Sequence, residues 1–303
     1  MTVEFATFGS IGIDDIVFPD GKTMWLIPGG GSMYSGLGMA IWGVRPSVVA
    51  PVGPGYPLEQ LETHLDFSHM PRLDRTMRNW GLYEEDGKRH FVLRSTTRDY
   101  RTFCATPASM GSETFRHVHI SAMPWDMQRD MARALRARGT EVLSIDGDDQ
   151  TAHEMTRTDI ADLASNADLF VPSKQDVQSM MPNLDAIDCL KCLRDIAPDV
   201  PVIVVKLGED GVAMHARNSN DLVLVPTAAE QVIDVTGAGD AFSGGTLKGY
   251  ADTRDPIEAV MRGAVSASFA IAAHGPAALL LATKHEMLRR LERLRSRIEL
   301  KPI

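Results

Sequence analysis

The chain has 303 residues, of which 44% are hydrophobic and 23% charged, a composition typical of a soluble globular protein. Its 31 basic and 40 acidic side chains give a net charge of −9, which disfavours nucleic acid as a partner. No signal peptide is recognisable and no apolar run is long enough to span a membrane, so no membrane partner is expected. The sparse, odd set of cysteines favours a reducing compartment, and we expect a cytoplasmic protein.

The first predicted strand runs from residue 5 to residue 13, and Asp14 and Asp15 follow at its carboxyl end. Ligands of open α/β sheets bind beyond the carboxyl ends of the strands. A carboxylate at that place can accept hydrogen bonds from two hydroxyl groups, which suits a polyol. Asp14 is therefore a candidate substrate-binding residue, and an ordinary turn residue is the equal alternative.

Two β-hairpins are predicted by the residues around two Asp-Gly turns. The first covers residues 17–25 with its turn at 20–21, and the second covers residues 82–93 with its turn at 86–87. In a chain that otherwise alternates strands and helices, two hairpins could form a small separate sheet. Two ordinary edge hairpins are the simpler alternative.

Between and after the hairpins, three stretches predict helix starts. The run Gly29-Gly30-Gly31 precedes a helix that carries Tyr34, a residue whose simplest role is core packing. The sequence from Ser173 to Asp176 is a variant of a helix capping box. Asp255-Pro256 begins a long helix to about residue 274, in which small residues around Ala264 allow close approach of another helix or of an adenine ring. A terminal helix is predicted over residues 284–298.

The most informative stretch is residues 234–245, where the pattern predicts that a strand is followed by a helix. Gly237 and Gly239 permit backbone conformations that a side chain would forbid, and they let a ligand approach closely. The first turn of the helix offers unpaired N–H groups from about residue 237 to residue 240, and these donors with the helix dipole form an anion site. Asp240 would repel a bound phosphate, so its expected work is on a proton. A glycine-rich turn with Asp240 as a capping residue is the plainer alternative.

Two other phosphate-binding loops are excluded by counting. A dinucleotide fingerprint needs a third glycine where the chain has Phe242. A Walker loop needs Gly-Lys-Ser/Thr, which does not occur here.

The sequence from Asp234 to Phe242, Asp-Val-Thr-Gly-Ala-Gly-Asp-Ala-Phe, closely resembles the C-terminal signature of the PfkB (ribokinase-like) carbohydrate and nucleoside kinases. The resemblance implies that Asp240 is the catalytic base. It also implies that the backbone amides of Gly237, Ala238, Gly239 and Asp240 form the anion hole.

The same resemblance assigns further residues. On the substrate side, Asp14 matches the aspartate that binds sugar hydroxyls, Gly29 and Gly30 match a substrate loop, and Tyr34 stands where an asparagine is common. On the nucleotide side, the loop Lys206-Leu-Gly-Glu-Asp-Gly resembles the one near the phosphates, and the resemblance implies nucleotide contacts for these residues: Lys206, Gly208, Gly211, Thr236 and Ala264. Asp176 stands near the expected Mg²⁺ waters, where Asn-x-x-Glu is usual.

Strands alternating with helices predict an α/β fold with a doubly wound, mainly parallel sheet flanked by helices. With the resemblance, this becomes a single ribokinase-like domain over residues 1–303. The insertions at 15–27 and 75–103 are then expected to form a small β lid, which also offers a surface for a homodimer.

The leading functional hypothesis is transfer of the γ-phosphoryl group of ATP to a hydroxyl of a sugar or sugar-like acceptor, with ATP and Mg²⁺ and room for a monovalent cation. Two alternatives stay open. One is a nucleoside kinase of the same fold, and the other is a catalytically idle protein that binds a metabolite and acts through partners. The idle reading is motivated by three departures from the family pattern, at Tyr34, Pro54 and Ser173.

Overall fold

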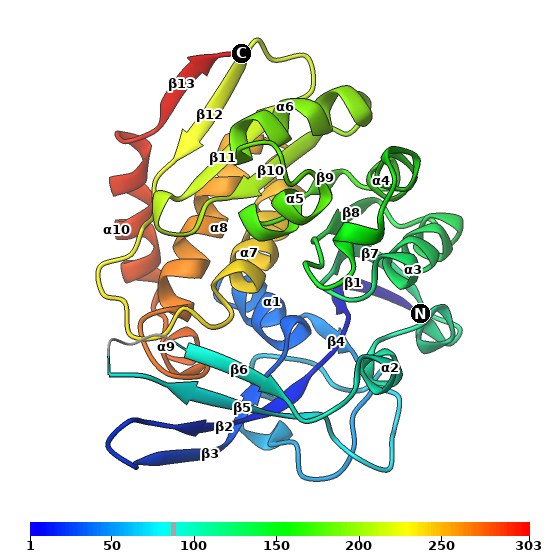
Figure 1. Ribbon diagram of the computed structural model, residues 1–303, viewed down its shortest axis with the longest axis vertical. Helices are drawn as coiled ribbons and strands as arrows, with labels where there is room; N and C mark the ends of the chain where they lie inside the picture. The colour runs from blue at the N-terminus through cyan, green and yellow to red at the C-terminus, as the bar shows by residue number, and fades with distance from the viewer. Residues whose placement is uncertain (86–88) are drawn as a thin grey trace.

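The computed structural model describes residues 1–85 and 89–303, and its main element is a large nine-stranded sheet (Figure 1). The strand order is β13-β12-β11-β10-β9-β8-β7-β1-β4. Neighbouring strands are parallel from β10 through to β4 and antiparallel from β10 to β13. The strands are β1 (Thr2–Phe8), β4 (Ser47–Val49), β7 (Thr114–Ile120), β8 (Val142–Ile145), β9 (Leu169–Phe170), β10 (Val202–Lys206), β11 (Val212–Ala216), β12 (Asp221–Val225) and β13 (Glu299–Pro302).

Helices cover both faces of this sheet (Figure 1). Residues of α1, α7, α8 and α10 belong to one hydrophobic core, and residues of α3, α4, α5 and α6 belong to the other. The predicted doubly wound, mainly parallel sheet is therefore confirmed. The helices are α1 (Gly31–Ala40), α2 (Thr97–Tyr100), α3 (Trp125–Ala137), α4 (Arg157–Ala164), α5 (Lys174–Met180), α6 (Ala186–Ile196), α7 (Ala238–Thr253), α8 (Pro256–Ala270), α9 (Ala277–Leu280) and α10 (Lys284–Arg295).

The central strand β10 shows why the sheet needs two helical layers. Side chains alternate between the two faces of a strand. Val202 and Val204 accordingly lie in the core with α1 and α7, whereas Ile203 and Val205 lie in the core with α3 and α6. All four are fully buried. An uninterrupted apolar run is thus the pattern expected of a parallel strand that is covered on both faces.

A second, smaller sheet has the strand order β3-β2-β5-β6, with strands β2 (Gly12–Val17), β3 (Thr23–Gly29), β5 (Arg78–Tyr83) and β6 (Arg89–Leu93). It lies below the large sheet in the view of Figure 1. Both predicted hairpins are present, and the parallel pair β2–β5 joins them into one sheet. The turn predicted at 86–87 lies outside the described residues. A homodimer through this sheet stays a prediction.

The structure corrects the expected position of Asp14. It does not follow the first strand of the large sheet, because β1 ends at Phe8 and the chain re-enters a strand at Gly12. Asp14 and Asp15 therefore belong to β2 of the small sheet, where they pair with β5. The chain leaves the large sheet at Gly9, where the absence of a side chain makes room for the hydroxyl groups of Ser32 and Ser121.

The C-terminal prediction also needs correction. The predicted helix over 284–298 ends at Arg295, and residues Glu299–Pro302 form β13 beside β12. The long helix predicted from residue 255 to about residue 274 ends at Ala270. The strand β13 is difficult to predict from sequence, because its four residues are all exposed and show no alternation of apolar and polar side chains.

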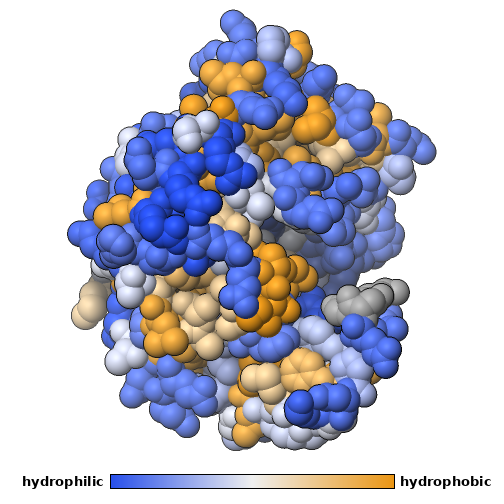
Figure 2. Space-filling view, turned by 90° about the vertical axis from the view of Figure 1, so that its left-hand side faces the viewer, coloured by the Kyte–Doolittle hydropathy of each residue, from blue (hydrophilic) through white to orange (hydrophobic). Residues whose placement is uncertain are grey.

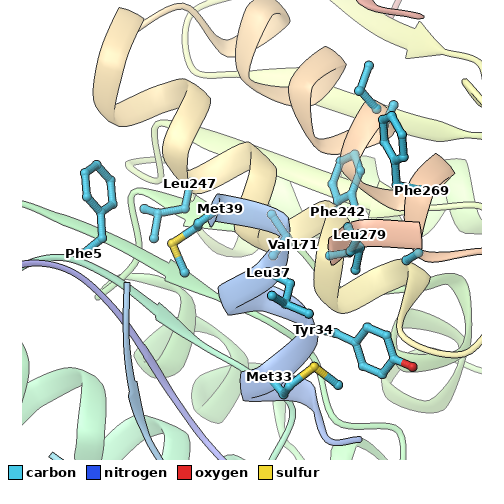
Figure 3. Packing of buried hydrophobic residues seen from close by; sticks show 14 of the residues in the cluster. Phe5, Met33, Tyr34, Leu37, Met39, Val171, Phe242, Leu247, Phe269 and Leu279 are labelled. Carbon is cyan, nitrogen blue, oxygen red and sulfur yellow. The ribbon is translucent and has the colours of Figure 1, made fainter. Parts of the chain in front are cut away.

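Helix α7 packs unusually close to its two neighbours, α1 and α8. A Cβ added to Gly38 of α1 would lie 2.8 Å from the Cα atom of Ala241, and one added to Gly249 would lie 2.8 Å from the Cα atom of Ala259. Backbones therefore touch where larger side chains would keep the helices apart. Figure 3 shows the side chains of α1, α7 and α8 meeting in the same core.

Only one residue separates the small sheet from α1. β3 ends at Gly29 and α1 begins at Gly31, so Gly30 alone makes the connection. Its φ angle of 101° lies in a region that favours glycine, and a Cβ there would collide with the backbone of Ile11.

Figure 2 views the side of the molecule that carries α10. Hydrophilic residues cover most of this face, and hydrophobic residues gather near its middle, beside a hollow. Within residues 1–85 and 89–303, no helix has the length and apolar character that a membrane crossing requires.

Candidate active site

The loop before α7 is shaped by Asp234. One oxygen of its carboxylate, Oδ1, accepts hydrogen bonds from the backbone N–H of Thr236 (2.9 Å) and from the Thr236 hydroxyl (2.5 Å). This local pairing turns the chain toward Gly237, which takes the left-handed conformation with φ of 75°. The helix then begins at Ala238, as the glycine-rich stretch predicts.

The first amides of α7 are available for a ligand. The N–H of Ala238 donates to the carbonyl of Val235 at 3.3 Å, so it is partly engaged. Among the described residues, the N–H groups of Gly239 and Asp240 donate to no backbone carbonyl, although the N–H of Asp240 interacts with the carboxylate of its own side chain. Two adjacent donors at the positive end of a sixteen-residue helix form a favourable position for an anion.

Asp240 stands at this helix start and faces α1. Its Oδ1 lies 2.7 Å from the place that a Cβ on Gly31 would occupy, so the glycine gives the carboxylate its room. The residue keeps part of its surface open to solvent. Burial and next the negative charge of Asp146 raise the pKa of Asp240 to about 6, against the opposing charge of Lys206. A carboxylate with this pKa can accept a proton near neutral pH.

The first of two pockets lies on the side of the loop that faces β10 and α8. It encloses about 410 Å³, partly open to solvent. The predicted nucleotide residues Lys206, Gly208, Gly211 and Ala264 line it, together with the helix-start residues Ala238 and Gly239 and with apolar neighbours. These residues come from segments separated by up to about sixty positions in the sequence, and the fold brings them to one place.

Lys206 is held at the end of β10 by a buried ion pair. Its Nζ lies 2.6 Å from Oδ1 of Asp146, the residue that follows β8, and the Ser243 hydroxyl donates to the other oxygen of Asp146 at 3.0 Å. The side chain also passes close to Gly239: a Cβ there would lie 3.3 Å from the ammonium nitrogen. Lys206 is thus positioned beside the free amides of α7.

A second pocket lies on the small-sheet side of the same loop, where about 250 Å³ of empty space, part of it open solvent, separates the side chains. Asp14 and Tyr34 line it, as do Tyr83, Arg89 and Asp234. Thr236, predicted on the nucleotide side, lies in this second pocket and not in the first. We refer to the two as the loop–helix pocket and the small-sheet pocket.

Asp14 is one of two buried acids that line the small-sheet pocket, with Asp234. Asn79 of β5 donates to its Oδ1 at 3.1 Å, and a Cβ on Gly29 would collide with its carboxylate. Burial raises the pKa of Asp14 to about 6, although the hydrogen bond from Asn79 opposes the shift. Gly29 therefore serves to make space for Asp14, and its carbonyl is held by the Tyr56 hydroxyl at 3.1 Å.

Tyr34 lies between the small-sheet pocket and the loop. Its side chain is 2% exposed, and a Cβ on Gly237 would run into its ring. Figure 3 shows the ring projecting from α1 with the hydroxyl at the end away from Met33 and Leu37. Burial, and next the charges of Asp14, Asp234 and Asp240, raise the pKa of Tyr34 well above its usual value. The tyrosine is thus both a core residue and a wall of the pocket.

The acids near Lys206 suit a divalent cation that arrives with a nucleotide. Burial and next the charge of Asp146 raise the pKa of Asp176. The charges of Asp146 and Asp176 also contribute to the raised pKa of Asp240. Three carboxylates therefore surround one lysine and leave negative charge to be balanced. Across the described parts of the chain, no three acidic, histidine or cysteine side chains are grouped to hold an ion alone. Mg²⁺ usually takes one or two carboxylates, several waters and substrate phosphates, so the donor set fits.

Asp176 itself is constrained by the start of α5. Its Oδ2 accepts the backbone N–H of Ser173 at 2.6 Å, and the Ser173 hydroxyl accepts the N–H of Asp176. The capping box predicted from the sequence is therefore confirmed. It occupies one carboxylate oxygen, so only the other is available for a ligand.

Sequence reasoning gave no role to several residues that line these pockets or bind the side chains that line them. Asp146 follows β8, and its place at a strand end was the available signal. Asn79, Tyr83 and Arg89 lie on strands of the small sheet, and no signal in the sequence specified which strand faces would turn toward the pocket.

Solved structures establish the class of fold. The crystal structure of a nucleoside kinase from Methanocaldococcus jannaschii, described as an archaeal member of the ribokinase family, superposes with a TM-score of 0.75 at 21% identity. The alignment covers 96% of this chain and 98% of that one. A putative ribokinase II from E. coli, solved in complex with ATP and Mg²⁺, gives a TM-score of 0.73 at 18% identity, over 96% of this chain and 99% of its own. The fold is ribokinase-like.

The sequence comparison gives the family. The profile of the pfkB family carbohydrate kinases matches residues 12–283, and the chain belongs to that family. A cytidine kinase from Thermococcus kodakarensis is 24% identical over 265 residues, which are 86% of this chain and 92% of the relative. The nucleoside kinase of Methanocaldococcus jannaschii is 24% identical over 295 residues, or 92% of each chain. The resemblance inferred from residues 234–242 is confirmed.

Proposed function

We propose that this kinase binds ATP in the loop–helix pocket and an alcohol acceptor in the small-sheet pocket, and that Asp240 takes the proton of the reacting hydroxyl. One observation carries the proposal. Residues 236–240 separate the two pockets, with Thr236 lining one and Ala238 and Gly239 lining the other. The free amides lie in this segment, and Asp240, whose pKa is about 6, is its last residue. Phosphoryl transfer needs donors for the transferring oxygens and a base for the acceptor at one place.

On the nucleotide side, the amides of Gly239 and Asp240 donate to oxygens of the γ-phosphoryl group as negative charge develops there. Gly237 turns the chain so that these amides face the phosphate, and Ala238 adds little because its N–H is already engaged. Lys206 contributes positive charge beside them, and the small side chain of Ala264 leaves room for the adenine ring.

Mg²⁺ supplies positive charge at the phosphates when bound, and Asp176 with its free oxygen would hold the waters of that ion. A monovalent cation stays a prediction, without a residue assigned to it.

On the acceptor side, Asp14 accepts hydrogen bonds from hydroxyl groups of the substrate, and Asn79 holds its carboxylate in place. The ring of Tyr34 forms the wall of the small-sheet pocket on the side of Gly237 and the anion hole. The small sheet acts as a lid, which excludes water that would compete with the acceptor.

The acceptor is a sugar or a nucleoside. Asp14 suits the hydroxyl groups of either. The relatives that align over most of the chain are a cytidine kinase and a nucleoside kinase, whereas the fructokinases align over a third to a half of it, which favours a nucleoside.

An ADP-release assay with ATP and Mg²⁺, across free sugars and nucleosides, tests the proposed function. We expect at least one acceptor to be turned over. A catalytically idle, metabolite-binding protein is the rival hypothesis, and the departures from the family pattern at Tyr34, Pro54 and Ser173 motivate it. If no acceptor led to ADP release, although ATP or a nucleoside stabilised the protein against thermal unfolding, the metabolite-binding alternative would be established.

The acidic limb of the pH profile is a second prediction. Asp240 must be deprotonated to accept the hydroxyl proton, and its pKa is about 6. We therefore expect kcat/KM to fall about tenfold for each pH unit below 6 and to be level from about 7 to 8. The pKa of Asp14 is also about 6, so its protonation adds to the fall. A profile that stays flat down to pH 5 would show that neither carboxylate titrates in the reaction.

A further inference from the structure

Two unsatisfied polar groups point to what the small-sheet pocket binds. Tyr83 of β5 and Arg89 of β6 are directly opposite each other across the strand pair, so their side chains lie on one face. Both residues line the pocket. The hydroxyl oxygen of Tyr83 and the Nη1 atom of Arg89 are buried, and neither makes a hydrogen bond of ordinary geometry within the described structure. The Tyr83 hydroxyl does lie near Asp234 and Thr236, and after burial the interaction with Asp234 is the main cause that raises the pKa of Tyr83.

The acid nearest to this guanidinium does not satisfy it. Nη1 of Arg89 lies 3.6 Å from Oδ1 of Asp234, which is an ion pair but is too long for a hydrogen bond. That oxygen already accepts both hydrogen bonds from Thr236, and the other oxygen of Asp234 lies 3.3 Å from Nδ1 of His274. Asp234 therefore balances the charge of Arg89 and leaves Nη1 of this pocket-lining arginine without a hydrogen-bond acceptor among the described residues.

The charges of the pocket select the kind of group that can accept this N–H. Arginine only donates, and a tyrosine hydroxyl can donate to the same oxygen. An anionic group would meet two carboxylates, Asp14 and Asp234, against one arginine. A neutral carbonyl oxygen can accept from both Arg89 and Tyr83 without that repulsion.

The neighbouring side chain indicates the shape of the group that carries the carbonyl. Phe91 follows Arg89 by two residues, so it lies on the same face of β6, and it lines the pocket. It is 42% exposed, and the Arg89 guanidinium lies 5.1 Å from the centre of its ring. An aromatic side chain that remains open at a pocket offers a flat apolar surface to a planar ring.

We propose that the acceptor is a nucleoside whose base carries a ring carbonyl, with Tyr83 and Arg89 donating to that oxygen and Phe91 packing on the base. The ribose hydroxyls are then left to Asp14. This inference rests on the proposed function and narrows it: free sugars lack the base, and adenosine lacks the carbonyl.

Steady-state kinetics with ATP and Mg²⁺ test the inference, using cytidine, inosine, adenosine, ribose and fructose as acceptors. We expect kcat/KM for cytidine or inosine to exceed that for adenosine and for both free sugars by about tenfold or more. The Arg89→Met and Tyr83→Phe variants should each lower kcat/KM for the preferred nucleoside by about 10- to 100-fold, mainly through KM. Their effect on adenosine should stay within about threefold, because adenosine offers no carbonyl for the lost donor.

His90→Gln is the matched control. His90 lies on the same strand but on its other face, where it pairs with Glu84, and it lines neither pocket. Its kinetic constants should be those of the unmodified protein. Tyr83→Phe removes one oxygen only, and stabilisation by ATP against thermal unfolding verifies that each variant is folded.

The possible outcomes distinguish a failure of this inference from a failure of the proposed kinase function. Turnover of fructose or ribose with inert nucleosides would overturn the inference and leave the kinase proposal standing. The inference would also be overturned if kcat/KM for adenosine equalled that for cytidine and inosine. The same holds if the Arg89→Met and Tyr83→Phe variants lowered kcat/KM for every acceptor by the same factor. Absence of turnover with every acceptor, in protein that still binds ATP, would overturn the proposed function and the inference together.

Discussion

Asp240→Asn is expected to lower kcat by about 10²- to 10⁴-fold in an ADP-release assay, because the amide cannot take the proton of the acceptor hydroxyl. The amide matches the carboxylate in size, so it fits the space beside Gly31 without new contacts. The free N–H groups of α7 remain in place. ATP binding, followed by thermal stabilisation, should therefore survive the substitution while turnover does not.

Asp252→Asn is the control for this change. Asp252 lies on the same helix, at its other end, where it pairs with Lys248 and Arg262 away from both pockets. Its turnover should match that of the unmodified protein. Near-normal turnover in Asp240→Asn would remove the carboxylate from the mechanism.

The same variant has a second readout in its stability. In the folded protein the pKa of Asp240 is about 6, above the value of about 4 expected for an unfolded chain. The folded state thus binds this proton more tightly, and ionisation of Asp240 lowers the stability of the unmodified protein as the pH rises from 4 through 6. Asp240→Asn should raise the unfolding temperature at pH 8 and have little effect at pH 4, a common consequence of relieving strain at a functional site.

Lys206→Met is expected to cost about 3 kcal/mol in the free energy of unfolding, because it leaves the buried carboxylate of Asp146 without its cation. The same change should lower kcat/KM for ATP by about 10- to 100-fold, because Lys206 supplies charge beside the amides of α7. Urea unfolding and steady-state kinetics measure the two effects separately.

A second substitution distinguishes the structural from the functional role of Lys206. In the double variant Lys206→Met/Asp146→Asn the buried charge is removed, so most of the lost stability should return while kcat/KM for ATP stays low. Lys191→Met is the control, since Lys191 is exposed and lies 3.8 Å from Asp188, and it should change stability by less than about 1 kcal/mol. Recovery of activity together with stability would limit Lys206 to a structural role.

The sequence predicted the large sheet well because its strands are buried on both faces and read as apolar runs, as in β10. It also located the loop before α7, because the two glycines and Asp240 lie within a few residues of one another. The position of Asp14 was misjudged, because a strand that crosses from one sheet to another looks the same in sequence as a single interrupted strand. The short edge strand β13 was missed for lack of a periodic pattern.

The donors of the small sheet illustrate what sequence reasoning could not reach. Tyr83 and Arg89 become partners only through the register of β5 and β6, and the parallel pairing of β2 with β5 turns them toward Asp14. Register depends on contacts distant in the chain, and a shift of one residue would place both side chains on the opposite face. The hairpins could therefore be predicted, but their inward-facing residues could not.

The single-residue connection at Gly30 has a mechanical meaning. Helix α1 packs against α7 with its backbone in contact at Gly38, so α1 is held firmly in the main body of the protein. A movement of β3 relative to α1 would therefore change the backbone torsion angles of Gly30, because no other residue lies between the two elements. Because a side chain at position 30 would collide with the backbone of Ile11, we expect any substitution there to displace β3, and with it the wall that Ile27 gives to the small-sheet pocket.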